Sequence, residues 1–460
     1  MDGYSAFMLV ATAWVLMMTA PALALFYGGM SRSKSVLNMM MMSYVSVAVV
    51  GIVYVLWGWS MSFSTGMAGG FFADPFELFF LDGLGGGDYV AVAFQMTFAV
   101  ITAALISGAV ADRVKLSSWV VFLPLWVTFS YFPIAHMVWG GGFIGENFPA
   151  QDYAGGTVVH INAGVAGLVL ALIIGRRIGF GKEPMKPHNL PLTMIGAGLL
   201  WFGWYGFNVG SIVFSGSTEE EIVAQFIEET GVTFLNTTIA TMAAIIGWLV
   251  VERLLHGKAT SLGAASGIVA GLVAITPACG AVDLEGAIAI GAISGALCAW
   301  AVGLKFKLNF DDSLDVVGVH LVGGIVGTVL IGFFSSANAP GGVDGLFYGG
   351  GVDSLVDQVM AALEMRDPGA FDPAAFDAFL ARQEDLGTKW APRYVRVSRS
   401  LPVTQTSKLQ KRQLRSERWE CDEPVWFRPG RDDGLRHLEP EDQETLRAAF
   451  VARGRESQLI

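Results

Sequence analysis

The sequence has few charged residues and very little cysteine. Asp, Glu, Lys and Arg make up 15% of its 460 residues, whereas soluble domains contain roughly 25%, so a soluble protein is excluded for most of the chain. The three cysteines, Cys279, Cys298 and Cys421, are too few and too scattered for a disulfide framework or a metal cluster. We therefore expect no metal and no other cofactor. The net charge of −11 argues against nucleic acid as a partner and is mild evidence for a cationic cargo.

Long hydrophobic runs dominate the chain instead. Hydrophobic residues make up 53% of it, and ten runs approach the roughly 18–25 residues that cross a bilayer as a helix. They cover residues 5–27, 38–63, 90–111, 117–139, 157–175, 190–213, 233–252, 261–278, 284–304 and 316–335. The segment before the first run lacks the basic residues of a cleaved signal, so this run is expected to remain as a helix. The pattern predicts an all-α polytopic membrane protein.

The basic residues indicate how these spans are oriented. Twelve Lys and Arg occur in the first 365 residues, and all of them follow spans 1, 3, 5, 7 or 9: Arg32, Lys34, Arg113, Lys115, Arg176, Arg177, Lys182, Lys186, Arg253, Lys258, Lys305 and Lys307. Loops rich in Lys and Arg stay on the cytoplasmic side. We therefore predict a multi-pass protein of the plasma membrane with its N-terminus outside.

One motif occurs twice, 160 residues apart. Asp152 and Asp312 each precede a histidine in the pattern Asp-x7-His-x3-Gly-x2-Gly, and the histidines are His160 and His320. His160 lies near the start of the fifth apolar span, and His320 lies near the start of the tenth. Because each half then contains five spans, an odd number, the halves are predicted to be inverted repeats.

An ionisable residue at membrane depth is by default a candidate for function. We expect His160 and His320 to face each other across a pore, where two neutral imidazoles can pass a proton without a net buried charge. The alternative is that each histidine only forms a hydrogen bond between helices. For Asp152, just before the fifth span, capping a helix is favoured over shaping the backbone of a cation site.

Aromatic residues cluster around the predicted pore. Phe98 lies in the third span, Trp139 ends the fourth span, and Trp204 and Phe207 precede Ser211 at the end of the sixth. Such residues often pack or form an interfacial belt. Near an outer mouth with acidic residues they are equally suited to a cation–π site, worth about 2 kcal/mol when desolvated. Composition alone leaves both interpretations open.

Eight short motifs follow one another along the chain: Phe26–Gly29, His136–Gly142, Asp152–Asn162, Gly179–Lys182, Pro187–Pro191, Gly206–Ser211, Thr276–Gly280 and Asp311–His320. In this order they resemble the ammonium transporter (Amt/Rh) family over about residues 5–340. The resemblance implies a homotrimer that carries ammonium, ammonia or methylammonium and is not an enzyme. PII-type signal proteins bind the cytoplasmic mouth in that family. The implied site residues are Trp139 and Ser211 for the outer cation, Phe98 over Phe207 as a gate, Trp204 beside the pore, His160 and His320 beneath, and Asp152 in support.

The last hundred residues have a different composition. They contain seventeen Lys and Arg and no apolar run of membrane length. Val352–Val359 looks like the start of the family's eleventh span, but the apolar run of this sequence stops there. From about residue 361 the chain resembles the C-terminal end of an adenylate-forming acyl-CoA synthetase, on Phe371–Phe376, Asp385–Val395 and Leu401–Arg412. There Lys408 matches a lysine that contacts the acyl-adenylate, and Ser407 stands where glycine is common.

These observations predict three parts: a membrane domain at 1–340, a junction at 341–360, and a small α+β soluble fragment at 361–460. Ammonium transport is the leading function. The alternatives are a chimeric product without function and an ammonium sensor whose tail is an interaction module. Ligase activity is not expected, because the large nucleotide-binding domain of the synthetases is absent from the sequence.

Overall fold

A computed structural model describes residues 2–363 except 149, 184 and 216, together with residues 394–396, 425–427, 436–439 and 442–443. The chain divides into two compact units, Met1–Leu363 and Glu364–Ile460. In the described part of the second unit, β3 (Tyr394–Arg396), β4 (Val425–Phe427) and β5 (Arg436–His437) form an antiparallel sheet in that order. Ser407 and Lys408 lie outside the described residues, so the resemblance to acyl-CoA synthetases stays a prediction.

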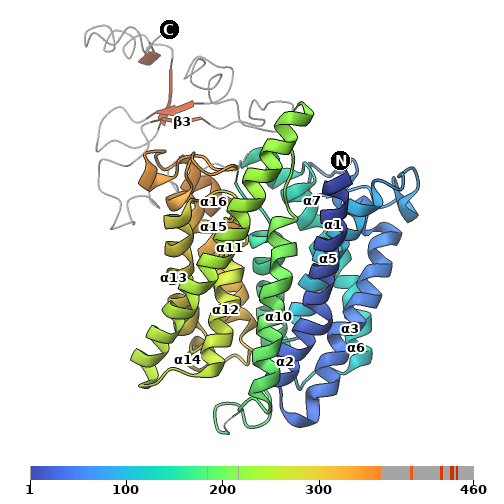
Figure 1. The fold of residues 1–460 in the computed structure, drawn as a ribbon, viewed down its shortest axis with the longest axis vertical. Coiled ribbons are helices and arrows are strands. Elements are labelled where there is room, and N and C mark those ends of the chain that lie inside the picture. The colour runs from blue at the N-terminus through green and yellow to red at the C-terminus, as the bar shows by residue number, and fades with distance from the viewer. Residues whose placement is uncertain are drawn as a thin grey trace. The chain divides into compact units, whose positions relative to one another are not determined.

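The first half of the membrane unit is helical apart from one short hairpin of β1 (Gly66–Met67) and β2 (Phe72–Ala73) (Figure 1). Its helices are α1 (Asp2–Met17), η1 (Met18–Leu23), α2 (Ala24–Met30), η2 (Ser33–Ser35), α3 (Val36–Val53), η3 (Tyr54–Gly58), α4 (Trp59–Phe63), η4 (Phe79–Leu81), α5 (Tyr89–Ile106), α6 (Leu116–Trp126), η5 (Val127–Tyr131), α7 (Phe132–Trp139), α8 (Phe143–Asn147), η6 (Gly156–Ile161) and α9 (Asn162–Ile174).

In the second half, the described residues form helices joined by loops, with one isolated antiparallel bridge between Val282 and Ser335. Its helices are α10 (Leu190–Val209), α11 (Glu219–His256), α12 (Ser261–Ile275), α13 (Leu284–Ala301), α14 (Leu304–Leu308), η7 (Val317–Leu321), α15 (Val322–Phe334), η8 (Leu346–Tyr348) and α16 (Asp353–Leu363). Helix α11 starts with a capping box, in which Thr218 and Glu221 each bond the other's backbone amide. It ends at Gly257, whose φ of 79° is the left-handed conformation that glycine tolerates.

All ten predicted spans contain a helix. Among the described residues, nine helical segments are long and apolar enough to cross a membrane, and the predicted span 261–278 forms the shorter α12. Helix α12 has 15 residues, or about 22 Å at 1.5 Å per residue. It stops before Thr276-Pro277, and the turn that follows is buried in the protein, where non-helical backbone at membrane depth is tolerated. The predicted all-α polytopic fold is confirmed.

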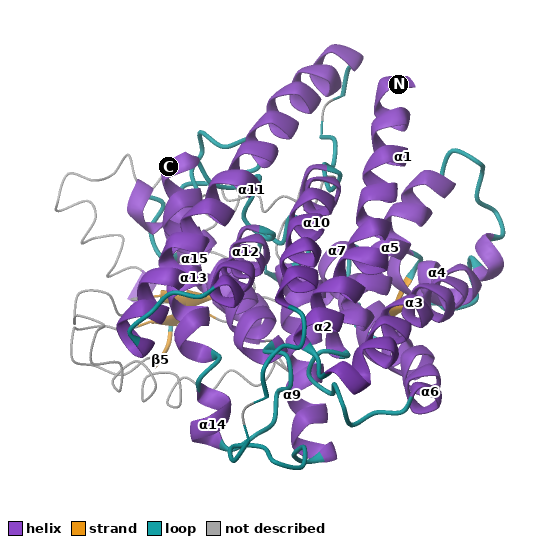
Figure 2. Cartoon of the chain, turned by 60° about the horizontal axis from the view of Figure 1, so that its bottom comes forward, coloured by secondary structure: helices purple, strands orange, loops and turns teal. Residues whose placement is uncertain are grey.

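The glycines of the repeated motif let the two halves pack closely. A Cβ added to Gly164 would lie 2.6 Å from the Cα of Leu321, the neighbour of His320. A Cβ added to Gly324 would lie 3.1 Å from the Cβ of His160. Each motif's glycine therefore makes room for the histidine turn of the other half. Figure 2 shows the helices of the membrane unit from another side.

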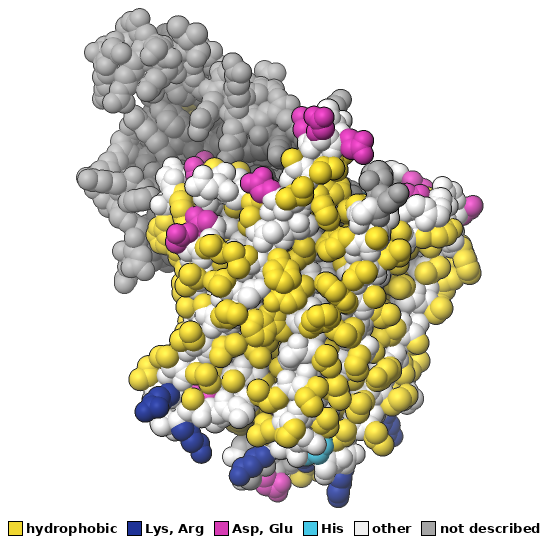
Figure 3. Space-filling view, viewed as in Figure 1, with side chains coloured by type: hydrophobic (Ala, Val, Ile, Leu, Met, Phe, Trp, Pro, Cys, Tyr) yellow, Lys and Arg dark blue, Asp and Glu magenta, His cyan; other side chains and the backbone are white. Residues whose placement is uncertain are grey.

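Charged side chains separate to the two ends of the membrane unit. On the face shown in Figure 3, Lys and Arg gather at one end and most Asp and Glu at the other, with a hydrophobic band between them. The N-terminus lies at the acidic end (Figure 1). This distribution agrees with the predicted orientation, in which the basic loops are cytoplasmic.

Helix α16 forms where the eleventh span was predicted to begin. It packs on α15 so closely that a Cβ on Gly332 would clash with the backbone of Leu355. Its described part covers 11 residues, about 17 Å at 1.5 Å per residue. The residues after 363 lie outside the described part of the chain, so the predicted stop of this span stays a prediction.

Candidate pore and cation site

The two histidines of the repeated motif meet inside the membrane unit. His160 lies on the π-helical turn η6 and His320 on η7. Their Nδ1 atoms are 3.3 Å apart and their ring centroids 5.4 Å apart, and both side chains are buried. At this distance one Nδ1 donates and the other accepts, so the neutral rings must adopt different tautomers. The prediction that they face each other is confirmed.

The aspartates of the motif hold the two histidine turns. The carboxylate of Asp152 accepts hydrogen bonds from the backbone amides of Gly155, Gly156, Thr157 and Val158 at the start of η6. Asp312 does the same for η7, accepting from Val316 at 3.0 Å and Val317 at 2.7 Å. These bonds satisfy amides that have no partner within the helix. The predicted capping role of Asp152 is confirmed.

The predicted gate is a closed pair of aromatic rings. Phe98 from α5 stacks on Phe207 from α10 with centroids 4.1 Å apart and an angle of 9° between the planes, and both side chains are buried. Trp204, one turn earlier on α10, lies 5.5 Å from the ring of His160. Its Nε1 donates to Thr276 Oγ1 at 2.8 Å, which connects α10 to the turn after α12.

Trp139 and Ser211 adjoin this gate. The ring of Trp139 meets Phe98 edge-on at 6.0 Å, and its Nε1 donates to the carbonyl of Asp152 at 2.9 Å. Ser211 Oγ donates to the carbonyl of Phe207 at 2.8 Å. Both residues are half-buried, unlike the two phenylalanines. The structure thus brings together all eight residues predicted from the sequence, by direct contact or through one neighbour.

Two cavities extend from the gate along the histidines. The first is lined by Phe207, Trp204, His160 and His320 among apolar side chains. The second shares His320 with the first and reaches Asp315. Together they mark a narrow, mostly apolar path. The path runs from the gate past both histidines toward the loop before η7.

The sequence matches a family model described as Ammonium Transporter Family over residues 6–365. The chain belongs to the ammonium transporter family. The match extends past the limit near residue 340 that the motifs indicated, and it includes α16. Within this family, an "Ammonium transporter" of Mycobacterium tuberculosis is 52% identical and one of Aquifex aeolicus 49% identical. The alignments cover 78% and 75% of this chain, and 80% of each relative.

Solved structures of the family have the same fold. The crystal structure of Saccharomyces cerevisiae Mep2 matches with a TM-score of 0.70 at 33% identity, covering 78% of this chain and 81% of that one. A structure described as "Sensor Amt Protein" matches with a TM-score of 0.70 at 27% identity, covering 78% of this chain and 88% of that one.

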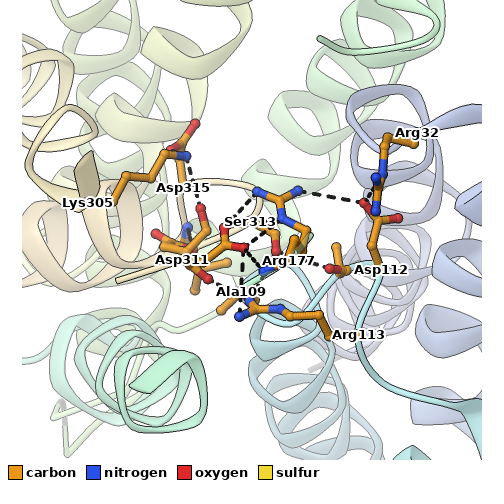
Figure 4. A network of polar contacts seen from close by, with 12 residues as sticks. Arg32, Ala109, Asp112, Arg113, Arg177, Lys305, Asp311, Ser313 and Asp315 are labelled. Carbon is orange, nitrogen blue, oxygen red and sulfur yellow. Dashed lines mark hydrogen bonds and ion pairs between the residues drawn. The ribbon is translucent and has the colours of Figure 1, made fainter. Parts of the chain in front are cut away.

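A buried ionic network in this ammonium transporter-family chain was not predicted. Arg177 pairs with Asp311 through several hydrogen bonds of 2.7–3.2 Å, and the exposed fractions of the two side chains are 6% and 0%. Arg177 also lies 3.7 Å from Asp112, which pairs with the half-exposed Arg32 at 2.7 Å. Figure 4 shows these residues converging from four loops. The network therefore ties the first half of the unit to the second.

Arg113 adds a second connection between these loops. Its guanidinium donates to the carbonyl of Asp311 at 2.6 Å and to Ser313 Oγ at 3.1 Å, and also to the carbonyls of Ala109 and Gly175 (Figure 4). Burial alone would raise the pKa of Asp311, but the bonds from Arg177 and the charge of Arg113 outweigh it and lower this pKa. The carboxylate next to the cap residue Asp312 is thus held ionised.

Proposed function

We propose that this chain transports ammonium by binding the cation outside the aromatic gate and passing ammonia along the paired histidines. The observation that carries the proposal is the continuous arrangement of Trp139, the stacked Phe98 and Phe207, and the histidine pair. Membership of the ammonium transporter family supports the same substrate, and methylammonium is a close analogue.

Binding of the cation and passage of ammonia are separate stages because moving a charge into an apolar medium is costly. An ion taken from water into an apolar medium meets an idealised Born cost on the order of 20 kcal/mol. The path below Phe207 is lined mostly by apolar side chains, so the cation gives up a proton at the gate and ammonia continues. The released proton is either returned to the outer solution or carried across separately from the ammonia. The ammonia can then exchange hydrogen bonds with His160 and His320. Potassium is excluded because it has no proton to release.

We further propose a homotrimer in the plasma membrane with the N-terminus outside. The family resemblance supports the trimer, and the twelve basic residues of the odd-numbered loops support the orientation. A PII-type signal protein is a candidate partner at the cytoplasmic mouth. We also propose that the sequence divides into a membrane domain at 1–340, a junction at 341–360 and a soluble fragment at 361–460.

Replacing Trp139 tests the outer cation site. Trp139→Leu removes one cation–π contact of up to about 2 kcal/mol, so half-saturation of methylammonium uptake should shift upward by a factor on the order of ten or more. Uptake by cells that lack other ammonium transporters measures this. Trp300→Leu is the matched control, because Trp300 is 47% exposed on α13. An unchanged half-saturation in Trp139→Leu would remove Trp139 from the site.

Ammonium sensing is a second candidate function, favoured by the similarity to the "Sensor Amt Protein". In this case the pore binds ammonium, and residues 361–460 act as an interaction module. Uptake measured with and without these residues separates the two functions. A transporter keeps its uptake rate after the deletion, whereas a sensor shows binding without flux in both forms.

The side of the membrane on which the second unit lies is a further prediction. Ten spans that begin outside end outside, and the sequence after residue 340 contains no apolar run of about 20 residues that could bring the chain back. We expect a C-terminal epitope to be cleaved by protease added to intact cells. Inserting a family-type eleventh helix after Val359 should protect the epitope and stabilise the trimer. Protection of the epitope in the unaltered chain would contradict the assigned topology.

A further inference from the structure

A buried amide on α16 contacts the backbone next to the capping aspartate. Gln358 is 1% exposed. Its carboxamide nitrogen donates to the carbonyl of Gln151 at 3.2 Å, and its oxygen accepts from the amide of Gln151 at 2.6 Å, in the orientation that satisfies both groups. A side chain that forms two bonds to one residue fixes both the position and the orientation of that peptide segment.

The segment held in this way is part of the outer site. The residue after Gln151 is Asp152, whose carbonyl accepts from Trp139 and whose carboxylate caps η6, the turn of His160. The side chain of Gln151 donates to the carbonyl of Gly341 at 2.6 Å. The segment is therefore held from its backbone and from its side chain by the chain that follows the tenth span.

The last turn of α16 supports the same region. Ala361 is 6% exposed and packs in a hydrophobic cluster with Met137, Phe143 and Ile144. Because Met137 and Phe143 flank Trp139 in the chain, α16 contacts residues on both sides of Trp139 in the sequence.

We propose that Gln358 is a positioning residue for the outer cation site, acting through Gln151 and Asp152, an inference that rests on the proposed function. Gln358 does not touch the cation. It sets where the Asp152 carbonyl holds the Trp139 ring and where the Asp152 carboxylate meets η6. Its loss should lower the apparent affinity for the cation more than the maximal rate.

Three variants of α16 test this assignment. Gln358→Leu keeps the volume and removes both hydrogen bonds. Gln358→Glu removes the donor when ionised and restores a donor and an acceptor when protonated. Val356→Ala is the matched control, because Val356 is 52% exposed on the same helix. Methylammonium uptake at pH 5.5 and pH 8, normalised to folded protein in the membrane, gives KM and maximal rate for each.

We expect Gln358→Leu to raise KM by about fivefold or more at both pH values, with a change in maximal rate below about twofold. Because burial at this position raises the pKa of a carboxyl group above its ordinary value, Gln358→Glu should be closer to the unaltered protein at pH 5.5 and resemble Gln358→Leu at pH 8. Val356→Ala should change neither value. A KM of Gln358→Leu equal to that of the unaltered protein, or a loss confined to maximal rate, would overturn the assignment.

Hydrogen exchange gives a readout that does not depend on transport. The amides of Gly155 to Val158 are held by Asp152, so their exchange should become about fivefold faster or more in Gln358→Leu and stay unchanged in Val356→Ala. Unchanged exchange in Gln358→Leu would overturn the assignment. If the unaltered protein shows no saturable uptake, the proposed function fails, while the exchange rates still decide whether Gln358 positions this segment.

Discussion

Asp311→Leu should lower the free energy of unfolding by about 3–5 kcal/mol, the cost of breaking a buried ion pair by removing one partner. The charge of Arg177 would be left among buried groups with Asp112 at 3.7 Å as its nearest described carboxylate. Thermal unfolding of the purified protein in detergent measures the loss as a fall in melting temperature. The double variant Asp311→Leu/Arg177→Met should recover part of it, because hydrophobic groups of similar volume often replace buried pairs without loss.

The sign of the pH dependence follows from the lowered pKa of Asp311. A carboxyl group with a lower pKa in the folded state stabilises the protein above its unfolded pKa of about 3.9, and this contribution is lost as the pH falls through the folded value. The difference between the unaltered protein and Asp311→Leu should therefore be complete near pH 7 and shrink below about pH 4. Arg32→Ala is the control, because this half-exposed partner should contribute less than about 1 kcal/mol. An equal loss in Arg32→Ala and Asp311→Leu would contradict the special role of the buried pair.

The spans and the histidine pair could be predicted because their signals are contained in short stretches of sequence. Apolar length identifies a span, and an exact repeat of spacing identifies equivalent positions such as His160 and His320. The gate of Phe98 and Phe207 needed more information. Aromatic residues near a membrane surface have several roles, and within the sequence only the ordered family motifs favoured a gate over packing or an interfacial belt.

The ionic network could not be predicted in the same way. The basic residues Arg113 and Arg177 indicated only which loops are cytoplasmic. Their partner Asp311 lies more than 130 positions away in the chain, and no local pattern specifies which loop meets which. The shortening of α12 is a related case. A signal was present at Pro277, since the residue before a proline disfavours helix, but the apolar run continued through it.

The contact of Gln358 with Gln151 was also beyond the sequence. A single glutamine in an amphipathic segment is usually a solvated residue, and nothing in its neighbours shows that it faces inward. The structure buries it because α16 packs on α15 at Gly332, where the absence of a side chain brings the helices together. Close helix approach at a small residue is common in membranes, but the sequence does not show which helix packs there.

His160→Ala and His320→Ala should each lower ammonium flux by about tenfold or more, and the double variant should cost less than the product of the two single losses. The physical reason is that each ring completes the other's hydrogen bond at 3.3 Å. When one histidine is removed, the Nδ1 of the other stays buried without its partner, which costs about 1–3 kcal/mol. Removing the second histidine as well breaks no further hydrogen bond between the rings, so the two losses are not independent. Uptake per folded protein, with the exposed His256→Ala as a control, measures the coupling. Mild losses that multiply independently would instead support the alternative in which each histidine only joins helices.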